Sequence, residues 1–244
     1  MAELGLDFLT LQAQFAERVA AVSDTSLEHA LFAYTSLPIR FGVPFGDLVE
    51  THPSWQTFLT VLRERNDLAT AIAAAHDAAR RSLLGLFPTR PQFGCFSFEY
   101  RPKRGIVRPH FANHDRSAGG PLDMARVDAR RAELTAMFQQ VRMQYPQARG
   151  VIGRSWLYNL EAYRRLFPPS YTETLAPLPN DYHSLGLWGQ FVDRRGQVKP
   201  ELAAQFHERT AASGDLDQLA ACFPLPMLRV GCSIGAFYRH YEIT

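Results

Sequence analysis

The chain has 244 residues, of which 46% are hydrophobic and 20% are charged, a composition typical of a globular protein and not of a disordered or fibrous one. Lysine and arginine number 26 against 24 aspartates and glutamates, so the formal net charge of +2 is too small to favour nucleic acid as a partner. Every apolar stretch is far shorter than the roughly 20 residues of a membrane span, and the N-terminus has no basic signal region. We therefore expect a cytoplasmic protein with no membrane partner.

The basic residues are almost all arginines. Lys103 and Lys199 are the only lysines among the 26 basic residues, so the chain is arginine-rich, and GC-rich codons explain most of this excess. The densest basic run, 101–116, is the exception. Because guanidinium groups bind carboxylates and phosphates through paired hydrogen bonds, this run makes a small anion the expected partner.

The first 88 residues form a predicted helical N-terminal part. Apolar residues recur at spacings of three and four over 4–22, which predicts an amphipathic helix, and a second helix follows the polar segment 23–26. Residues 37–46 are interrupted by prolines and glycines but are rich in apolar side chains, so we expect a loop that packs against the core. Two more helices are expected, over 54–65 and 67–84.

A β-hairpin is predicted next. The aromatic run 93–100 has no helical periodicity and indicates a strand, and the proline and glycine in 101–105 favour a tight turn before a return strand over 106–113. A polar, glycine-containing loop follows. Pro121 suits the first turn of a helix, which we expect to continue to Met143.

The rest of the chain mixes both kinds of element. Strands are expected over 150–153, 184–192 and 227–241, and helices over 159–166, 200–212 and 215–222. Helices followed by mixed elements predict the α+β class. We expect a helical part over 1–88 and a mixed β-sheet with flanking helices over 89–244, either as two parts or as one continuous domain.

The hairpin carries the candidate catalytic residues. Because side chains alternate along a strand, Arg108 and His110 share one side of the return strand, and Glu99 lies on one side of its partner. If the two sides coincide, a carboxylate and an imidazole meet on one sheet surface, where either could serve as a general base. Glu99 or His110 is then the expected base, and Arg108 is expected to bind substrate. The alternative is a surface with cross-strand ion pairs.

Metal binding is the weakest of the chemical readings. His110 and His114 are four residues apart, but they leave a strand and enter a loop, whereas this spacing suits a metal on a helix. The three cysteines form no CxxC pair and are typical of a reducing compartment. We expect no metal ligands, with metal-dependent chemistry at His110, His114 and Asp115 as an alternative.

The loop before the predicted helix is a candidate anion site. Glycines that precede a helix N-terminus can bind phosphate through their backbone N–H groups, so Arg116, Gly119 and Gly120 are expected to hold a cofactor phosphate. The segment matches neither the GxGxxG pattern nor a P-loop, and turn formation alone also explains its glycines.

Two tryptophans are candidate substrate contacts. Trp156 lies in the distinctive stretch 155–168, and Trp188 lies on the predicted strand 184–192. Burial in the core is the alternative for both. Ser155 is not part of a GxSxG elbow, which disfavours a serine hydrolase.

The order of elements over 93–192, together with the segment Gly153-Arg-Ser-Trp-Leu157, resembles the core of the GNAT family of N-acetyltransferases. The resemblance implies an acyl-CoA donor whose pyrophosphate binds the loop, where Arg116, Gly119 and Pro121 stand in the family's Arg/Gln-x-x-Gly-x-Gly/Ala positions. The proline departs from that pattern. The resemblance also implies that Tyr158 or Tyr163 protonates the leaving thiol.

These observations favour an acyltransferase that moves an acyl group from a CoA-type donor to a small amine or hydroxyl. The alternative is a non-catalytic domain on the same scaffold that binds a small molecule or a protein.

Overall fold

The computed structural model describes residues 5–44, 46–65, 67–82, 91–115 and 119–244. Its contacts divide the chain into two compact units. The first, which we call the helical unit, consists of Ala2–Pro88 and Asn180–Leu225; the second, the sheet unit, consists of Thr89–Pro179 and Pro226–Thr244. The expected boundary between residues 88 and 89 lies outside the described residues. The stretch Asn180–Leu225, expected in the α+β part, instead groups with the helices.

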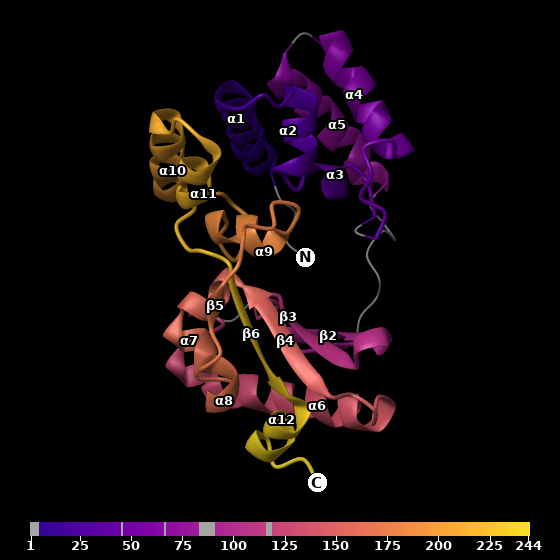
Figure 1. Ribbon diagram of the computed structural model, residues 1–244, viewed down its shortest axis with the longest axis vertical. Helices are drawn as coiled ribbons and strands as arrows, with labels where there is room; N and C mark the ends of the chain where they lie inside the picture. Colours follow the sequence, from indigo (N-terminus) through magenta and orange to yellow (C-terminus); the bar gives the residue numbers. More distant parts are fainter. Residues whose placement is uncertain (1–4, 45, 66, 83–90, 116–118) are drawn as a thin grey trace. The chain divides into compact units, whose positions relative to one another are not determined.

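The helical unit contains most of the predicted helices (Figure 1). The described helices of this unit are α1 (Leu6–Val22), α2 (Leu27–Ala33), α3 (Leu37–Arg40), α4 (Pro53–Arg65), α5 (Leu68–Ser82), α9 (Leu185–Trp188), α10 (Pro200–Ala212) and α11 (Leu216–Ala221), of which α3 and α9 were not predicted. The predicted cap of α2 is present, because the Ser26 hydroxyl accepts a hydrogen bond of 3.2 Å from the backbone N–H of His29. None of the described helices is long and apolar enough to cross a membrane.

The segment 37–46 is only partly a loop. Leu37–Arg40 forms one helical turn, α3, with Pro38 in its first turn, where a proline lacks no hydrogen bond. The expectation that this apolar stretch packs inward is confirmed, since Leu37 and Val43 are almost fully buried.

Aromatic rings form much of the core of the helical unit. The ring of Phe15 on α1 lies 5.5 Å from Trp188 and 5.4 Å from Phe223, measured between ring centroids. The predicted strand 184–192 is wrong: Leu185–Trp188 is helical, and Gly189–Phe191 is a 3-10 turn. The Ser184 hydroxyl accepts from the Gly186 N–H at 2.9 Å, which starts a turn that a strand would not make.

The sheet unit holds six strands within the described residues, in the order β1-β2-β3-β4-β6-β5, so the predicted α+β class is confirmed. The strands are β1 (Gln92–Phe93), β2 (Phe96–Arg101), β3 (Ile106–Phe111), β4 (Gly150–Ser155), β5 (Ala176–Pro177) and β6 (Leu228–Ser233). The helices are α6 (Val127–Gln144), α7 (Glu161–Arg164), α8 (Pro169–Thr172) and α12 (Ile234–His240). The predicted hairpin is confirmed: β2 and β3 are antiparallel, and Gly105 provides the turn with a φ of 61°. β3 runs parallel to β4.

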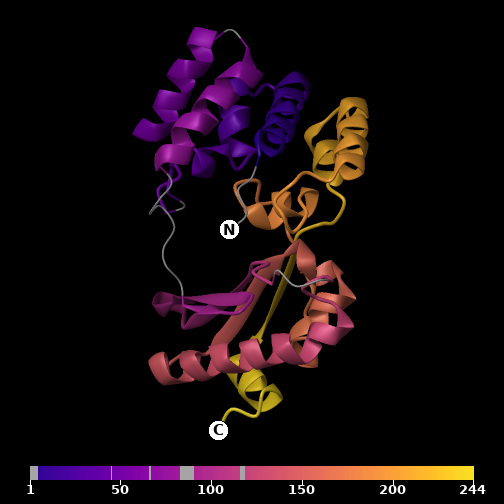
Figure 2. The same cartoon turned by 180° about the vertical axis from the view of Figure 1, so that it is seen from behind.

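The two faces of this sheet are built differently. Figures 1 and 2 show α6, α8 and α12 on the same side of the sheet, which we call the covered face. Its side chains form one apolar cluster that includes Phe96, Val107, Val151 and Val230. The alternate residues of the same strands point to the other side, the open face, over which the described helices of this unit do not pass (Figure 2).

Two boundaries in the sheet unit differ from prediction. The helix expected from Pro121 begins only at Val127, after a 3-10 turn at Met124–Arg126, because the Asp123 carboxylate accepts from the Gly120 N–H and closes a separate turn first. The expected strand 227–241 ends at Ser233. Its second half is α12, whose residues Ile234 and Phe237 turn one apolar stripe into the core.

Candidate functional site

The predicted cluster on the hairpin is present on the open face. Glu99 is the register partner of Arg108, and Ser97 is the partner of His110. One carboxylate oxygen of Glu99 accepts a hydrogen bond of 3.0 Å from Arg101 Nε. The other lies 3.9 Å from Arg108 Nη1 and 3.7 Å from His110 Nε2. The structure therefore brings Glu99, Arg108 and His110 together. The sequence left the register of the two strands open, and the observed register places all three side chains on one face.

The environment of Glu99 keeps its carboxylate ionised. Partial burial raises the pKa of Glu99, but the hydrogen bond from Arg101 and the positive charges of Arg101, Arg108 and His110 outweigh that effect. The net pKa is below the ordinary value of 4.5. An ionised carboxylate 3.7 Å from an imidazole can orient it and stabilise its protonated form.

The sheet is interrupted beside this cluster. β3 and β4 are paired at Ile106↔Gly150 and Val107↔Val151, and the ladder stops there, although both strands continue as 108–111 and 152–155. Alternate residues of these segments point toward β2 and β6, so the backbone groups that face the gap are those of Phe111, of Arg154 and of Pro109, which has no N–H. Arg108 and His110 lie on one of these segments, so the candidate residues border the interruption.

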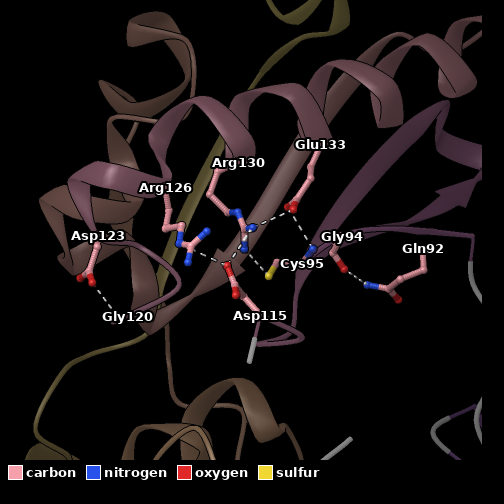
Figure 3. Close-up of polar contacts among 9 residues, drawn as sticks. All are labelled: Gln92, Gly94, Cys95, Asp115, Gly120, Asp123, Arg126, Arg130 and Glu133. Atoms are coloured by element: carbon pink, nitrogen blue, oxygen red, sulfur yellow. Dashed lines mark hydrogen bonds and ion pairs between the residues drawn. The ribbon is translucent and has the colours of Figure 1, made fainter. Parts of the chain in front are cut away.

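The N-terminal end of α6 is held by a buried ion-pair network (Figure 3). Arg130 Nη2 lies 2.8 Å from Glu133 Oε1 and 3.2 Å from Asp115 Oδ2. Its other amino nitrogen donates to the sulfur of Cys95, and the Cys95 N–H donates to Glu133 Oε2 at 3.0 Å. The network ties the loop after β3 and the turn before β2 to α6. Sequence reasoning missed it, and the only local signal is the helical spacing of Arg130 and Glu133.

In the expected phosphate loop, a carboxylate from the loop itself binds a backbone amide. The Gly120 N–H donates to Asp123 Oδ2 at 2.6 Å (Figure 3), and a Cβ on Gly119 would lie 2.5 Å from the same oxygen. The Gly120 amide is thus engaged within the loop, and a phosphate at this position would have to displace Asp123. Arg116, the third residue expected here, lies outside the described residues.

The candidate acids lie on the opposite side of the sheet from the candidate base. Tyr158 and Tyr163 are almost fully buried in the apolar cluster of the covered face. The Tyr158 hydroxyl lies 2.9 Å from that of Tyr171, directly over Gly153, where a Cβ would come within 2.0 Å of it. Burial raises the pKa of Tyr158 and Tyr163 well above 10. The structure does not place either tyrosine with Glu99 and His110.

The two tryptophans lie in different units. Trp156 is partly buried in a 3-10 turn (Trp156–Asn159) that follows β4 in the sheet unit. Trp188 is fully buried in the helical unit, where its indole N–H donates to the Tyr182 carbonyl at 2.9 Å. Trp188 is therefore a core residue, the alternative that the sequence left open.

The described residues contain no group of three or more His, Cys, Asp or Glu side chains arranged to hold a metal ion. His114 is exposed, and Asp115 is engaged by Arg130. Burial raises the pKa of the Cys95 thiol, so this cysteine is not an activated nucleophile.

Comparisons of the chain with protein-family models, with curated proteins and with solved structures found no match.

Proposed function

We propose that the sheet unit is an acyltransferase, which moves an acyl group from a CoA-type thioester to a small amine or hydroxyl. One observation carries the proposal: Glu99 and His110 lie on the open face beside the point where the β3–β4 ladder stops. This arrangement combines a base with backbone groups that face a gap in the ladder, and an extended ligand can bind such groups through hydrogen bonds.

The topology is consistent with the same proposal. β3 and β4 are parallel neighbours connected through α6, and β6 lies between β4 and β5. A parallel pair that parts beyond its first residues is what the resemblance to the N-acetyltransferases requires, because the donor has to enter between those strands.

In the proposed reaction, His110 is the base and Glu99 orients it. His110 removes a proton from the acceptor nitrogen or oxygen, which attacks the thioester carbonyl carbon. The new C–N or C–O bond forms, the C–S bond breaks, and the sulfur leaves as a thiol after taking up one proton. The ionised Glu99 stabilises the protonated imidazole between these two proton transfers.

The donor contacts follow from the backbone. The amide groups of a CoA-type arm can pair with backbone groups that face the gap, which include the Pro109 carbonyl and the N–H and C=O groups of Phe111 and Arg154. Its phosphates can reach the Gly120 amide only after Asp123 moves away. Replacing Asp123 with alanine should therefore strengthen donor binding, whereas the exchange Asp128→Ala, on the same helix terminus, is the matched control.

The engagement of Gly120 by Asp123 also favours a second candidate, a non-catalytic domain that binds a small molecule on the open face. The two candidates differ in a thermal-denaturation experiment with acetyl-CoA, and with ADP as the control for adenine and phosphate alone. A donor at 100 times its Kd should stabilise the protein by about 2.7 kcal/mol. Absence of stabilisation by acetyl-CoA rejects the acyltransferase and leaves the binding domain.

Catalysis is tested by thiol release from acetyl-CoA in the presence of amine acceptors. His110→Asn and Glu99→Gln should each lower kcat, the first by about 10²-fold or more, while donor binding is unchanged. His114→Asn is the matched control, because His114 is exposed nearby and should leave the rate unaltered. Equal rates for the His110 variant and the wild type would contradict the assigned base.

A further inference from the structure

Two arginines occupy the open face on the other side of the interruption. Arg154 on β4 and Arg229 on β6 are register partners, directly opposite each other in an antiparallel pair. Both belong to the open face, because Gly153 and Val230, the residues adjacent to them in the strands, face the covered side. Both are exposed, and within the described part of the chain neither guanidinium has a hydrogen bond or an ion pair.

This placement is unfavourable for the protein alone. The Cβ atoms of directly opposed residues are about 4.5–5.5 Å apart, and like charges at such positions destabilise a sheet. The other arginines of this face differ, since Arg101 and Arg108 both approach the Glu99 carboxylate. Two unpaired guanidinium groups side by side form a site that a carboxylate or phosphate can bridge with paired hydrogen bonds.

The Arg154–Arg229 pair lies as far along the sheet as the candidate base His110. Counted from the last register pair, Val107↔Val151, both His110 on β3 and Arg154 on β4 lie three residues further along. A ligand held by the arginines would therefore reach toward His110 across the interruption. Ile152 and Gly231 are the neighbouring register pair on this face.

We propose that Arg154 and Arg229 bind an anionic group, a carboxylate or a phosphate, of the acceptor that receives the acyl group. This inference rests on the proposed function, and it specifies the substrate class: a small amine that carries an acidic group a few bonds from its nitrogen.

The first test measures binding without any acyl donor, so it does not depend on the reaction. Calorimetry of the full chain with β-alanine and with phosphoethanolamine should detect binding of at least one of them, and the identity of that ligand separates a carboxylate from a phosphate. The variants Arg154→Gln and Arg229→Gln should each weaken this binding about tenfold or more, and the lysine variants should weaken it less. Arg104→Gln, an exposed arginine on the hairpin turn, is the matched control and should change nothing.

The second test measures thiol release from acetyl-CoA with two pairs of acceptors: β-alanine against propylamine, and phosphoethanolamine against ethanolamine. In the arginine variants, KM for the anionic acceptor should rise about tenfold with little change in kcat, and KM for the neutral one should stay constant. Equal use of both acceptors, or equal effects of Arg104→Gln, would overturn the inference. If anion binding depends on the arginines but no acceptor is acetylated, the proposed function fails and the anion site stands.

Discussion

The covered and open faces of the sheet are formed by alternate residues of the same strands, yet they satisfy their polar groups in opposite ways. Under the covered face, the hydroxyls of Tyr158 and Tyr171 bond to each other among packed rings. On the open face, Glu99 is shared by Arg101, Arg108 and His110, and Arg154 and Arg229 have no counter-ion among the described residues. This difference indicates that the covered face holds the fold together, and it is the basis on which we propose a ligand site on the open face.

The largest predicted effect is on the covered face. Phe138 on α6 is fully buried, with its ring centroid 4.5 Å from that of Phe237. Phe138→Ala should lower the free energy of unfolding by about 3–5 kcal/mol, because it removes buried surface and leaves a cavity. The paired variant Arg154→Gln should change it by less than about 0.5 kcal/mol. Urea denaturation measures the free energy of unfolding of both variants. Similar losses in the two would contradict the claim that the covered face, and not the open face, stabilises the fold.

Breaking the network at the start of α6 should rank second. Arg130→Met leaves Asp115 and Glu133 partly buried without their shared cation, at a cost of about 3 kcal/mol. Arg131→Met, on the neighbouring helical position, has no such pair among the described residues and should cost much less. Equal midpoints in urea for the two variants would show that the buried network does not stabilise the loop.

Substitutions at Tyr158 on the covered face and at Glu99 on the open face should have opposite effects on stability and on activity. Tyr158→Phe should cost about 1 kcal/mol of stability by removing the hydrogen bond to Tyr171, and it should leave thiol release unchanged. Glu99→Gln should do the reverse, with nearly unaltered stability and a lower rate. Loss of activity in the Tyr158 variant at normal stability would instead identify this tyrosine as the acid.

The smallest effect concerns pH. Because the pKa of Glu99 is lowered in the folded protein, its ionised form contributes stability above the unfolded value near 4.5, and this contribution is lost as the pH falls through the folded pKa. The difference in stability between the wild type and Glu99→Gln should be constant above about pH 5 and shrink below pH 4.5. A difference that grows on acidification would contradict the lowered pKa.

The hairpin and most of the N-terminal helices could be predicted because they depend on local patterns of residues. The aromatic run and the turn residues over 93–113 correctly indicated the hairpin. The sequence left open whether Glu99 shares a face with Arg108 and His110, because alternation alone does not give the register of the two strands. Among the described residues up to Ser82, α1, α2, α4 and α5 correspond to expected helices, whereas α3 lies in a segment that was expected to be a loop.

Features that depend on distant partners could not be predicted in this way. The face on which Tyr158 packs is decided by its contact with Tyr171 and by the space over Gly153. The opposition of Arg154 and Arg229 requires the pairing of β4 with β6, far apart in the chain. The segment 184–192 failed for another reason: its glycines and aromatic residues fit both a strand and a short helix, and the Ser184 turn decides between them.

The central claim, that ligands bind on the open face where β3 and β4 part, is tested most directly by hydrogen exchange of the backbone amides with and without acetyl-CoA. We predict that two amides that face the gap, that of Phe111 in the segment 108–111 and that of Arg154 in the segment 152–155, become protected when acetyl-CoA is present, because they then bond to the ligand. The amide of Val107, in the paired part of the ladder, should stay equally protected in both states. Unchanged exchange in both segments, with protection appearing elsewhere in the chain, would contradict the claim.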